Sequence, residues 1–390
     1  MENSSKPVIH SKLPHIGTTI FTVMSKLAHD CNALNLSQGF PNFPADDELI
    51  LLVEHYMKKG FNQYAPMSGV QPLREAIAIM VEKLYNTVYH PEKEIIITSG
   101  ATEALFAAIA AVVSPGDEVI VFEPAYDSYV PAIELNGGVA VYITLEPPYF
   151  NINWQQVKAK VTSKTRMIVM NSPHNPATSV LTANDLQELA SIVKGTNIFL
   201  LSDEVYEHIV FNGVKHQSFC THPVLKERSF ICGSFGKTFH VTGWKIGYCV
   251  APAELSAEFR KIHQYLTFCT NTPIQLALAD FLKNPDNYLS VSAFYEAKRN
   301  KFLGGLKNSR FTFIPSQGSY FQNLCYSAIS DENDFDLAVR LTKEKGVASI
   351  PVSVFYHKLN DYKTLRFCFA KDDETLERAG EMLSRINDIA

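Results

Sequence analysis

GSFGKTFHVTGWKIG, residues 233–247, places a lysine, Lys237, between a glycine and a threonine. Gly-Lys-Thr also ends a nucleotide-binding P-loop, which needs a glycine five positions before its Gly-Lys pair so that successive backbone N–H groups can surround the phosphates. Ile231 stands at that position, and Gly233 is too close to the lysine to build the loop. The spacing therefore argues against a P-loop, and Lys237 needs another explanation.

Short apolar segments surround this stretch and alternate with helical patterns from about residue 90 onward. The segments that predict strands are 94–100, 118–126, 139–145, 166–176, 197–207, 229–237 and 246–252. Helical patterns lie between several of them, for example 101–113 and 182–194, the second with Thr182 as its expected N-cap. Strands that alternate with crossover helices predict an α/β fold with a mostly parallel sheet.

The pattern changes after about residue 282. A long helical stretch, 287–307, is followed by shorter strands and helices. We interpret this part as a second, smaller α+β domain, with the first forty or so residues packing near it. The expected division is a large domain of residues 45–285 and a small domain of residues 1–44 together with 286–390.

The composition sets limits on the class of protein. The chain has 390 residues, 46% of them hydrophobic and 19% charged, with a net charge of -5, which gives no electrostatic case for binding nucleic acid or an anionic membrane. The longest apolar stretch, 104–113, is too short to cross a bilayer, and residues 1–14 lack the apolar core of a signal peptide. Seven cysteines occur singly, so we expect free thiols in a cytoplasmic protein and no metal site.

Polar residues follow the predicted strands, where an open parallel sheet binds its ligands. They are Ser99, Gly100, Ala101, Thr102, Tyr126, Asn171, Asn175, Asp203, Tyr206, Ser234 and Lys237. Each has a purely structural alternative: residues 99–102 as a helix N-cap, Asn175 as a turn residue, Asp203 as a helix cap and Lys237 as a solvated side chain. Together they suit one ligand with a phosphate, a flat ring, a ring nitrogen, a phenolic oxygen and an aldehyde, which is pyridoxal 5'-phosphate.

Eight motifs in order along the chain resemble the fold-type I pyridoxal-phosphate aminotransferases, in the branch of the kynurenine, glutamine-phenylpyruvate and methionine aminotransferases. They are NLSQGFPNFP (35–44), NQYAPMSGVQPLREAIA (62–78), TSGATEAL (98–105), PAYDSY (124–129), NSPHNPATS (171–179), SDEVYE (202–207), GSFGKTFHVTGWKIGY (233–248) and LRFCFA (365–370). The resemblance covers nearly the whole chain. It implies a large domain with a mostly parallel, seven-stranded sheet flanked by helices, plus the smaller α+β domain.

The resemblance also implies a role for each matching residue. Lys237 would hold the cofactor as a Schiff base, Asp203 would pair with its ring nitrogen, and Tyr206 and Asn175 would contact its phenolic oxygen. The resemblance further implies that Tyr126 stacks on the ring and that Arg366, with Asn175 and Gly39, binds the substrate carboxylate. Tyr64 would reach the cofactor phosphate from a neighbouring subunit. The other implied phosphate contacts are Ser99, Gly100, Ala101, Thr102, Ser234 and Lys245. A homodimer with shared active sites follows from the role of Tyr64.

Two departures from the family pattern stand out. Residues 177–179 read Ala-Thr-Ser where many relatives have Thr-Gly after the Asn-Pro pair, which makes the backbone path of this loop an open question. Lys245 stands where some aminotransferases have arginine, so its phosphate contact would be a point charge instead of a two-pronged one.

The function implied is a ping-pong transfer of the amino group of an L-amino acid to a 2-oxo acid, with Lys237 moving the Cα proton and Asp203 and Tyr206 supporting it. The apolar segment 15–21, with Tyr64 and Tyr126, favours methionine, aromatic, kynurenine or glutamine donors, and no second arginine is evident for a dicarboxylate. The alternative is a carbon–sulfur β-lyase that uses the same cofactor. A regulator would need an added DNA-binding module, for which no residues are left over.

Overall fold

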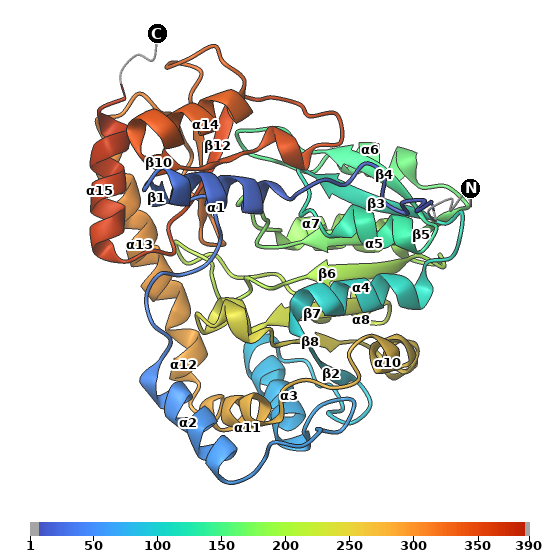
Figure 1. Ribbon diagram of the computed structural model, residues 1–390. Helices are drawn as coiled ribbons and strands as arrows, with labels where there is room; N and C mark the ends of the chain where they lie inside the picture. Colours follow the sequence, from blue (N-terminus) through green and yellow to red (C-terminus); the bar gives the residue numbers. More distant parts are fainter. Residues whose placement is uncertain (1–7, 387–390) are drawn as a thin grey trace, which may run out of the picture.

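Seven short apolar segments form the main sheet in the computed structural model, which describes residues 8–386. The strands are β2 (Ile95–Thr98), β3 (Glu118–Glu123), β4 (Val139–Thr144), β5 (Thr165–Asn171), β6 (Phe199–Asp203), β7 (Ser229–Ser234) and β8 (Gly247–Val250). Their order is β2-β8-β7-β6-β5-β3-β4, and β8 is antiparallel to both of its neighbours while all other pairs are parallel. The expected mostly parallel, seven-stranded sheet is confirmed (Figure 1).

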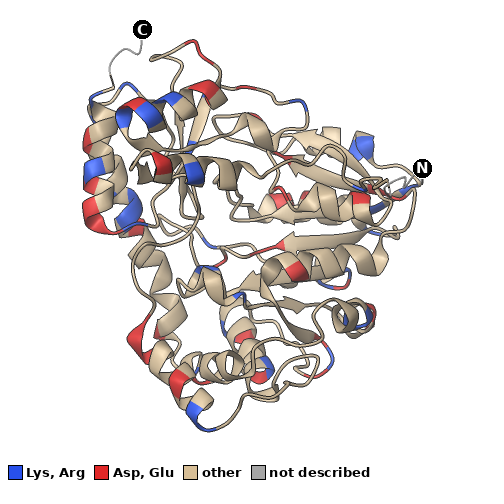
Figure 2. Cartoon of the chain, in the orientation of Figure 1, with Lys and Arg blue, Asp and Glu red and all other residues tan. Residues whose placement is uncertain are grey.

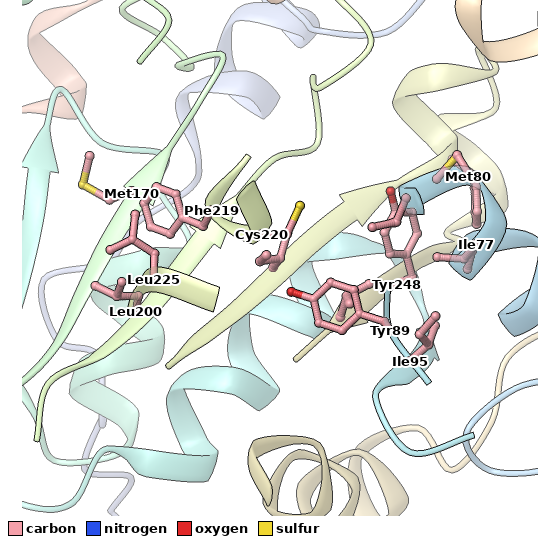
Figure 3. Close-up of a cluster of buried hydrophobic side chains, with 14 of the residues drawn as sticks. Ile77, Met80, Tyr89, Ile95, Met170, Leu200, Phe219, Cys220, Leu225 and Tyr248 are labelled. Carbon is pink, nitrogen blue, oxygen red and sulfur yellow. The ribbon is translucent and has the colours of Figure 1, made fainter. Parts of the chain in front are cut away.

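Alternate residues of each strand pack into different hydrophobic layers. Ile96 belongs to a core with Leu105 and Phe259, whereas Ile95 and Ile97 belong to a separate core. Figure 3 shows part of that second core, where Ile95 and Tyr248 lie near residues of α3. Because both faces of the sheet are covered, the strands read as continuous apolar segments.

The helices that accompany the main sheet are α2 (Asp47–Lys58), α3 (Gln71–Tyr85), α4 (Gly100–Val112), α5 (Tyr129–Leu135), α6 (Trp154–Lys160), α7 (Ala183–Val193), α8 (Pro223–Lys226), α9 (Phe235–Thr238), α10 (Ala253–Leu266) and α11 (Thr272–Phe281). Among them, α4 and α7 match the expected helices 101–113 and 182–194, whereas α9 occupies the end of the segment 229–237, which was expected to be a strand. Thr182 caps α7 as expected, in a capping box with Asp185.

A second layer of structure lies at the top of Figure 1 and extends down its left side, and it is built from both ends of the chain. It contains α1 (Ile20–Asp30), β1 (Leu34–Asn35), α12 (Asp286–Leu289), α13 (Val291–Gly305), β9 (Phe321–Cys325), α14 (Asp334–Lys345), β10 (Val347–Ala348), β11 (Ile350–Pro351), β12 (Thr364–Cys368) and α15 (Asp373–Ser384). β1 pairs with β10, so the amino-terminal segment packs where we expected it. The helix expected over 287–307 consists of α12 and α13, which meet at Ser290.

The two layers share a hydrophobic core. Val205, Ile209 and Phe211, which follow β6 of the main sheet, pack in the same cluster as Leu36 and Leu365. The boundaries 45–285 and 1–44 with 286–390 therefore stay a prediction, and residues 1–7 and 387–390 of that prediction lie outside the described chain.

Charged residues of both signs are mixed over the helices. Figure 2 shows blue and red stretches of the ribbon along α15, and the strands at the centre of the view are mostly tan. Over residues 8–386, none of the helices combines the length and the apolar character needed to cross a bilayer. All seven cysteines are free thiols.

Candidate active site

A cavity of about 240 Å³ opens beyond the carboxyl ends of strands β5, β6 and β7. Its walls include twelve of the residues singled out from the sequence: Gly39, Gly100, Ala101, Thr102, Tyr126, Asn171, Asn175, Asp203, Tyr206, Ser234, Lys237 and Lys245. Three others, Ser99, Tyr64 and Arg366, do not line it. The sheet thus gathers side chains that are far apart in the sequence around one space.

Lys237 reaches this cavity from α9, a single helical turn that follows β7 directly. Its Nζ donates to the hydroxyl of Tyr320 at 3.0 Å and lies 3.4 Å from the carbonyl oxygen of Gly39. Withdrawal of the amine from bulk water lowers the pKa of Lys237 to about 8. An amine with that pKa is partly uncharged near neutral pH, which is the state that acts as a nucleophile or base.

Asp203 is the last residue of β6 and is buried. Its Oδ2 accepts a hydrogen bond from the hydroxyl of Tyr129 at 2.5 Å, and its Oδ1 one from the backbone N–H of Val205 at 3.3 Å. Burial raises the pKa of Asp203 to about 6. The alternative role as a helix cap is wrong, because residues 205–208 form a turn and not a helix. A cationic group in the cavity would stabilise this carboxylate.

Asn171 and Asn175 fix the loop that follows β5. The side chain of Asn171 donates to the carbonyl oxygen of Asp203 at 2.8 Å and accepts from the backbone N–H of Asn175 at 2.7 Å. The side chain of Asn175 therefore enters the cavity from a loop that is tied to the neighbouring strand.

Arg366 lies in β12 and is fully buried next to Asn175. Its Nη1 donates to Asn175 Oδ1 at 2.6 Å and its Nη2 to the carbonyl oxygen of Ser37 at 3.1 Å. Its Nε is buried and has no hydrogen-bond partner within residues 8–386. Although burial lowers the pKa of Arg366 to about 10, the guanidinium stays cationic at neutral pH. A buried cation with an unused N–H is suited to an incoming carboxylate.

Aromatic rings surround the guanidinium of Arg366. Its central carbon lies 3.9 Å from the ring centre of Phe321, 5.2 Å from that of Phe21 and 5.5 Å from that of Phe355. Of the apolar lining expected from residues 15–21, Phe21 is thus placed beside the arginine, although it does not line the cavity. The surroundings of the cation are apolar on several sides.

The start of α4 forms the opposite end of the cavity. Ser99 is its N-cap residue but makes no side-chain capping bond, so the first N–H groups of the helix keep their bonding capacity. Gly100 has a φ of +74°, and a Cβ at that position would lie 3.3 Å from Nζ of Lys245. The ammonium group of Lys245 therefore lies beside the positive end of α4, an arrangement that favours a bound anion.

The loop 177–179, which departs from the family pattern, forms a turn that requires a strained backbone conformation at Thr178. Thr178 occupies the position of the family's glycine and has a φ of +66°, which is unusual for a β-branched residue. Its backbone N–H donates to the carbonyl oxygen of His174 at 2.8 Å. The open question about this loop is answered: the threonine adopts the left-handed conformation.

Two tyrosines at the site, Tyr129 and Tyr320, were not predicted from the sequence. Tyr129 donates to Asp203, and Tyr320 donates to the carbonyl oxygen of Gly39 at 2.5 Å while it accepts from Lys237. Tyr129 could have been found from the sequence, because it ends the PAYDSY motif and a buried tyrosine hydroxyl needs a hydrogen-bond partner. Tyr64 is 84% exposed and its ring meets that of Phe268, away from the cavity of its own chain.

Comparison with known proteins settles the family. Residues 32–383 match the family described as aminotransferase class I and II. This chain belongs to that family. It is 50% identical over 385 residues to the methionine aminotransferase of Escherichia coli, covering 98% of this chain and 100% of the relative. It is 35% identical to the kynurenine–oxoglutarate transaminase of Dictyostelium discoideum, covering 95% of this chain and 94% of the relative.

Solved structures agree with this assignment. The crystal structure of YbdL from Escherichia coli, identified as a methionine aminotransferase, has a TM-score of 0.96 at 50% identity, covering 97% of this chain and 100% of that one. A Thermus thermophilus aspartate aminotransferase mutant has a TM-score of 0.89 at 26% identity, covering 98% and 100%. The protein is therefore an aminotransferase with the fold-type I architecture.

Proposed function

We propose that this aminotransferase binds pyridoxal 5'-phosphate at Lys237 and moves the amino group of an L-amino acid with an uncharged side chain, of the methionine, aromatic, kynurenine or glutamine type, to a 2-oxo acid. The observation that carries the proposal is the cavity itself. A partly uncharged amine, Lys237, and a buried carboxylate, Asp203, line it together with an amide, Asn175, that is held by a buried arginine.

The residues present fit the cofactor. Asp203 supplies a negative partner for the ring nitrogen, and Tyr206, whose pKa burial raises, keeps its proton to donate to the phenolic oxygen. The start of α4, with Ser234 and Lys245, offers N–H groups, a hydroxyl and a positive charge to the phosphate. When bound, the cofactor supplies an electron sink that stabilises negative charge at the substrate Cα.

The chain's own residues divide the remaining tasks. The unprotonated amine of Lys237 accepts the proton from the Cα of the donor amino acid in the first half-reaction, and its ammonium form gives a proton to the Cα of the product amino acid in the second. Tyr320 and Gly39 fix the position of Nζ. Arg366 and Asn175, which are hydrogen-bonded to each other, would bind the α-carboxylate together, so the reacting bond keeps one orientation. Tyr129 holds the carboxylate of Asp203 in place.

The aromatic rings around Arg366 support a preference for donors with apolar or aromatic side chains. Phe21, Phe321 and Phe355 present rings to Arg366, and a thioether or aromatic side chain packs well against rings. Besides Lys237 and Lys245, the cavity walls carry no cation among the residues that the structure describes. A donor with a second carboxylate would leave it unpaired, so we expect L-aspartate to react at least about 100-fold less efficiently than L-methionine.

The test is the absorbance of the purified protein loaded with pyridoxal 5'-phosphate. L-methionine should bleach its yellow colour, a 2-oxo acid should restore it, and Lys237→Ala should show neither change. A protein that stays colourless after cofactor is supplied would contradict the proposal. Release of pyruvate from cystathionine without any 2-oxo acid would instead assign the β-lyase reaction.

A further inference from the structure

A second cavity, of about 440 Å³, lies between the main sheet and the three-stranded sheet. Its walls come from the segment 145–154, the loop 177–182, the start of α7, residues 312–317, and strands β9 and β12. It shares Asn171 with the catalytic cavity, and its volume lies in the range of small-molecule sites, about 300–1,000 Å³. The proposed transamination makes no use of it.

The walls of this second cavity carry neither lysine nor arginine, and their one carboxylate is already hydrogen-bonded. Asp185 is that carboxylate, and the other titratable side chains among the described lining residues are Tyr149, His174 and Cys325. Asp185 Oδ1 accepts from Trp154 Nε1 at 2.9 Å and its Oδ2 from the backbone N–H of Thr182 at 2.8 Å. An anionic ligand would lose its hydration here without gaining a cationic partner, and a cation would compete with the N–H donors of Asp185, so the cavity favours an uncharged ligand.

Rings and one polar group define the shape of such a ligand. Phe122, Tyr149, Phe150, Trp154 and Phe313 line the cavity. His174 accepts from the backbone N–H of Ala177 through Nδ1 at 3.2 Å, which places the proton of the neutral ring on Nε2. Within residues 8–386 that N–H meets no hydrogen-bond acceptor. A flat aromatic molecule with a carbonyl oxygen matches both features.

The wall of the second cavity also positions the substrate-binding pair. Asn323 lines the cavity and its side chain donates to the carbonyl oxygen of Pro176 at 2.9 Å, next to Asn175. The carbonyl oxygen of Thr178, another wall residue, accepts from the backbone N–H of Gln317 at 3.3 Å. Because the strained residue Thr178 is three positions from Asn175, a shift of this loop displaces the amide that contacts Arg366.

We propose that this second cavity is a regulatory site for an uncharged aromatic molecule with a carbonyl oxygen, of the aromatic carboxamide class, and that its occupancy changes the affinity of the active site for the donor amino acid. The binding part stands on the cavity alone. The regulatory part rests on the proposed role of Arg366 in gripping the substrate carboxylate.

The experiment titrates benzamide into the cofactor-loaded Trp244→Phe variant, in which Trp154 is the remaining tryptophan. We expect a saturable change of Trp154 fluorescence, no such change with benzoate, and a KM for L-methionine that shifts by about 5-fold or more at saturating benzamide. Thr312→Phe places a ring in the cavity and should abolish both effects. The matched control is Ser191→Phe, which adds the same ring to the exposed face of α7 and should leave both effects intact.

Each result decides one part of the proposal. An absent or unsaturable fluorescence change, or one that survives in Thr312→Phe, overturns the site. A saturable change without a shift in KM overturns the regulation and leaves the site. If Thr312→Phe does not match Ser191→Phe in melting temperature, a crystal structure of the wild-type holoenzyme with benzamide decides, since a ring beside His174 supports the site and its absence overturns it. Fluorescence reports binding even if the proposed transamination fails.

Discussion

Burial is the main reason why the amine of Lys237 is prepared for chemistry, and the neighbouring cations Lys245 and Arg366 lower its pKa further. Its pKa of about 8 makes the amine of the cofactor-free protein increasingly reactive as the pH rises through 8, because deprotonation creates the nucleophile. We expect the rate at which this form captures pyridoxal 5'-phosphate to follow that midpoint. Tyr320→Phe removes an oxygen that accepts from the ammonium, so the midpoint should move to lower pH. Stopped-flow absorbance between pH 6 and pH 10 measures both; an unchanged or higher midpoint would contradict the contact.

Arg366 makes a second prediction at the scale of one residue. Arg366→Ala should raise the KM for the donor by about 100-fold or more, since a buried charge-assisted contact to the carboxylate is lost, while the bound cofactor stays. Arg366→Lys keeps the charge without the two-pronged geometry, so its KM for the donor should lie between those of the wild type and Arg366→Ala. Steady-state kinetics and the absorbance of the bound cofactor check this. Loss of cofactor from Arg366→Ala would overturn the assignment.

At the scale of elements, the strands and their polar ends followed from the sequence because buried parallel strands are continuous apolar segments that stop at turn residues. The partners across the fold did not. Tyr129 meets Asp203 from 74 residues away and Tyr320 meets Lys237 from 83, and the packing that joins them leaves no local pattern. The sequence after Asp203 also left its role as a helix cap open, because the local residues do not distinguish a turn from the start of a helix.

The loop after β5 carries a prediction about stability. Thr178→Gly should raise the free energy of unfolding by about 1 kcal/mol, because glycine adopts a φ of +66° without strain and this gain exceeds its entropic cost. Thr182→Gly is the control, since Thr182 has a φ of -97° and only a capping bond to lose. Urea unfolding of the two variants measures the difference. A Thr178→Gly protein less stable than wild type would mean that the side chain packs more favourably than the backbone is strained.

At the scale of the whole molecule, an exposed aromatic cluster marks one surface of the chain. Tyr64 and Tyr265 are 84% and 85% exposed, and the ring centre of Tyr64 lies 5.5 Å from that of Phe268. We propose that a second copy of the chain covers this surface and receives the Tyr64 hydroxyl at its cofactor phosphate. Tyr64→Phe should then weaken cofactor binding by about 10-fold or more, the loss of a hydrogen bond to a charged group. Equilibrium dialysis against Tyr265→Phe as control measures it.

Mixing two defective variants tests whether the active sites are shared. If Tyr64 serves the partner's site, a heterodimer of Lys237→Ala and Tyr64→Phe carries both changes in one site and leaves the other site intact. Random exchange makes half of the dimers mixed, so activity at limiting cofactor should recover to about a quarter of the wild-type level. Lys237→Ala mixed with Arg366→Ala is the matched control, because both residues serve their own chain's site and every site of that mixture stays defective. Recovery in neither mixture would place the function of Tyr64 within its own chain.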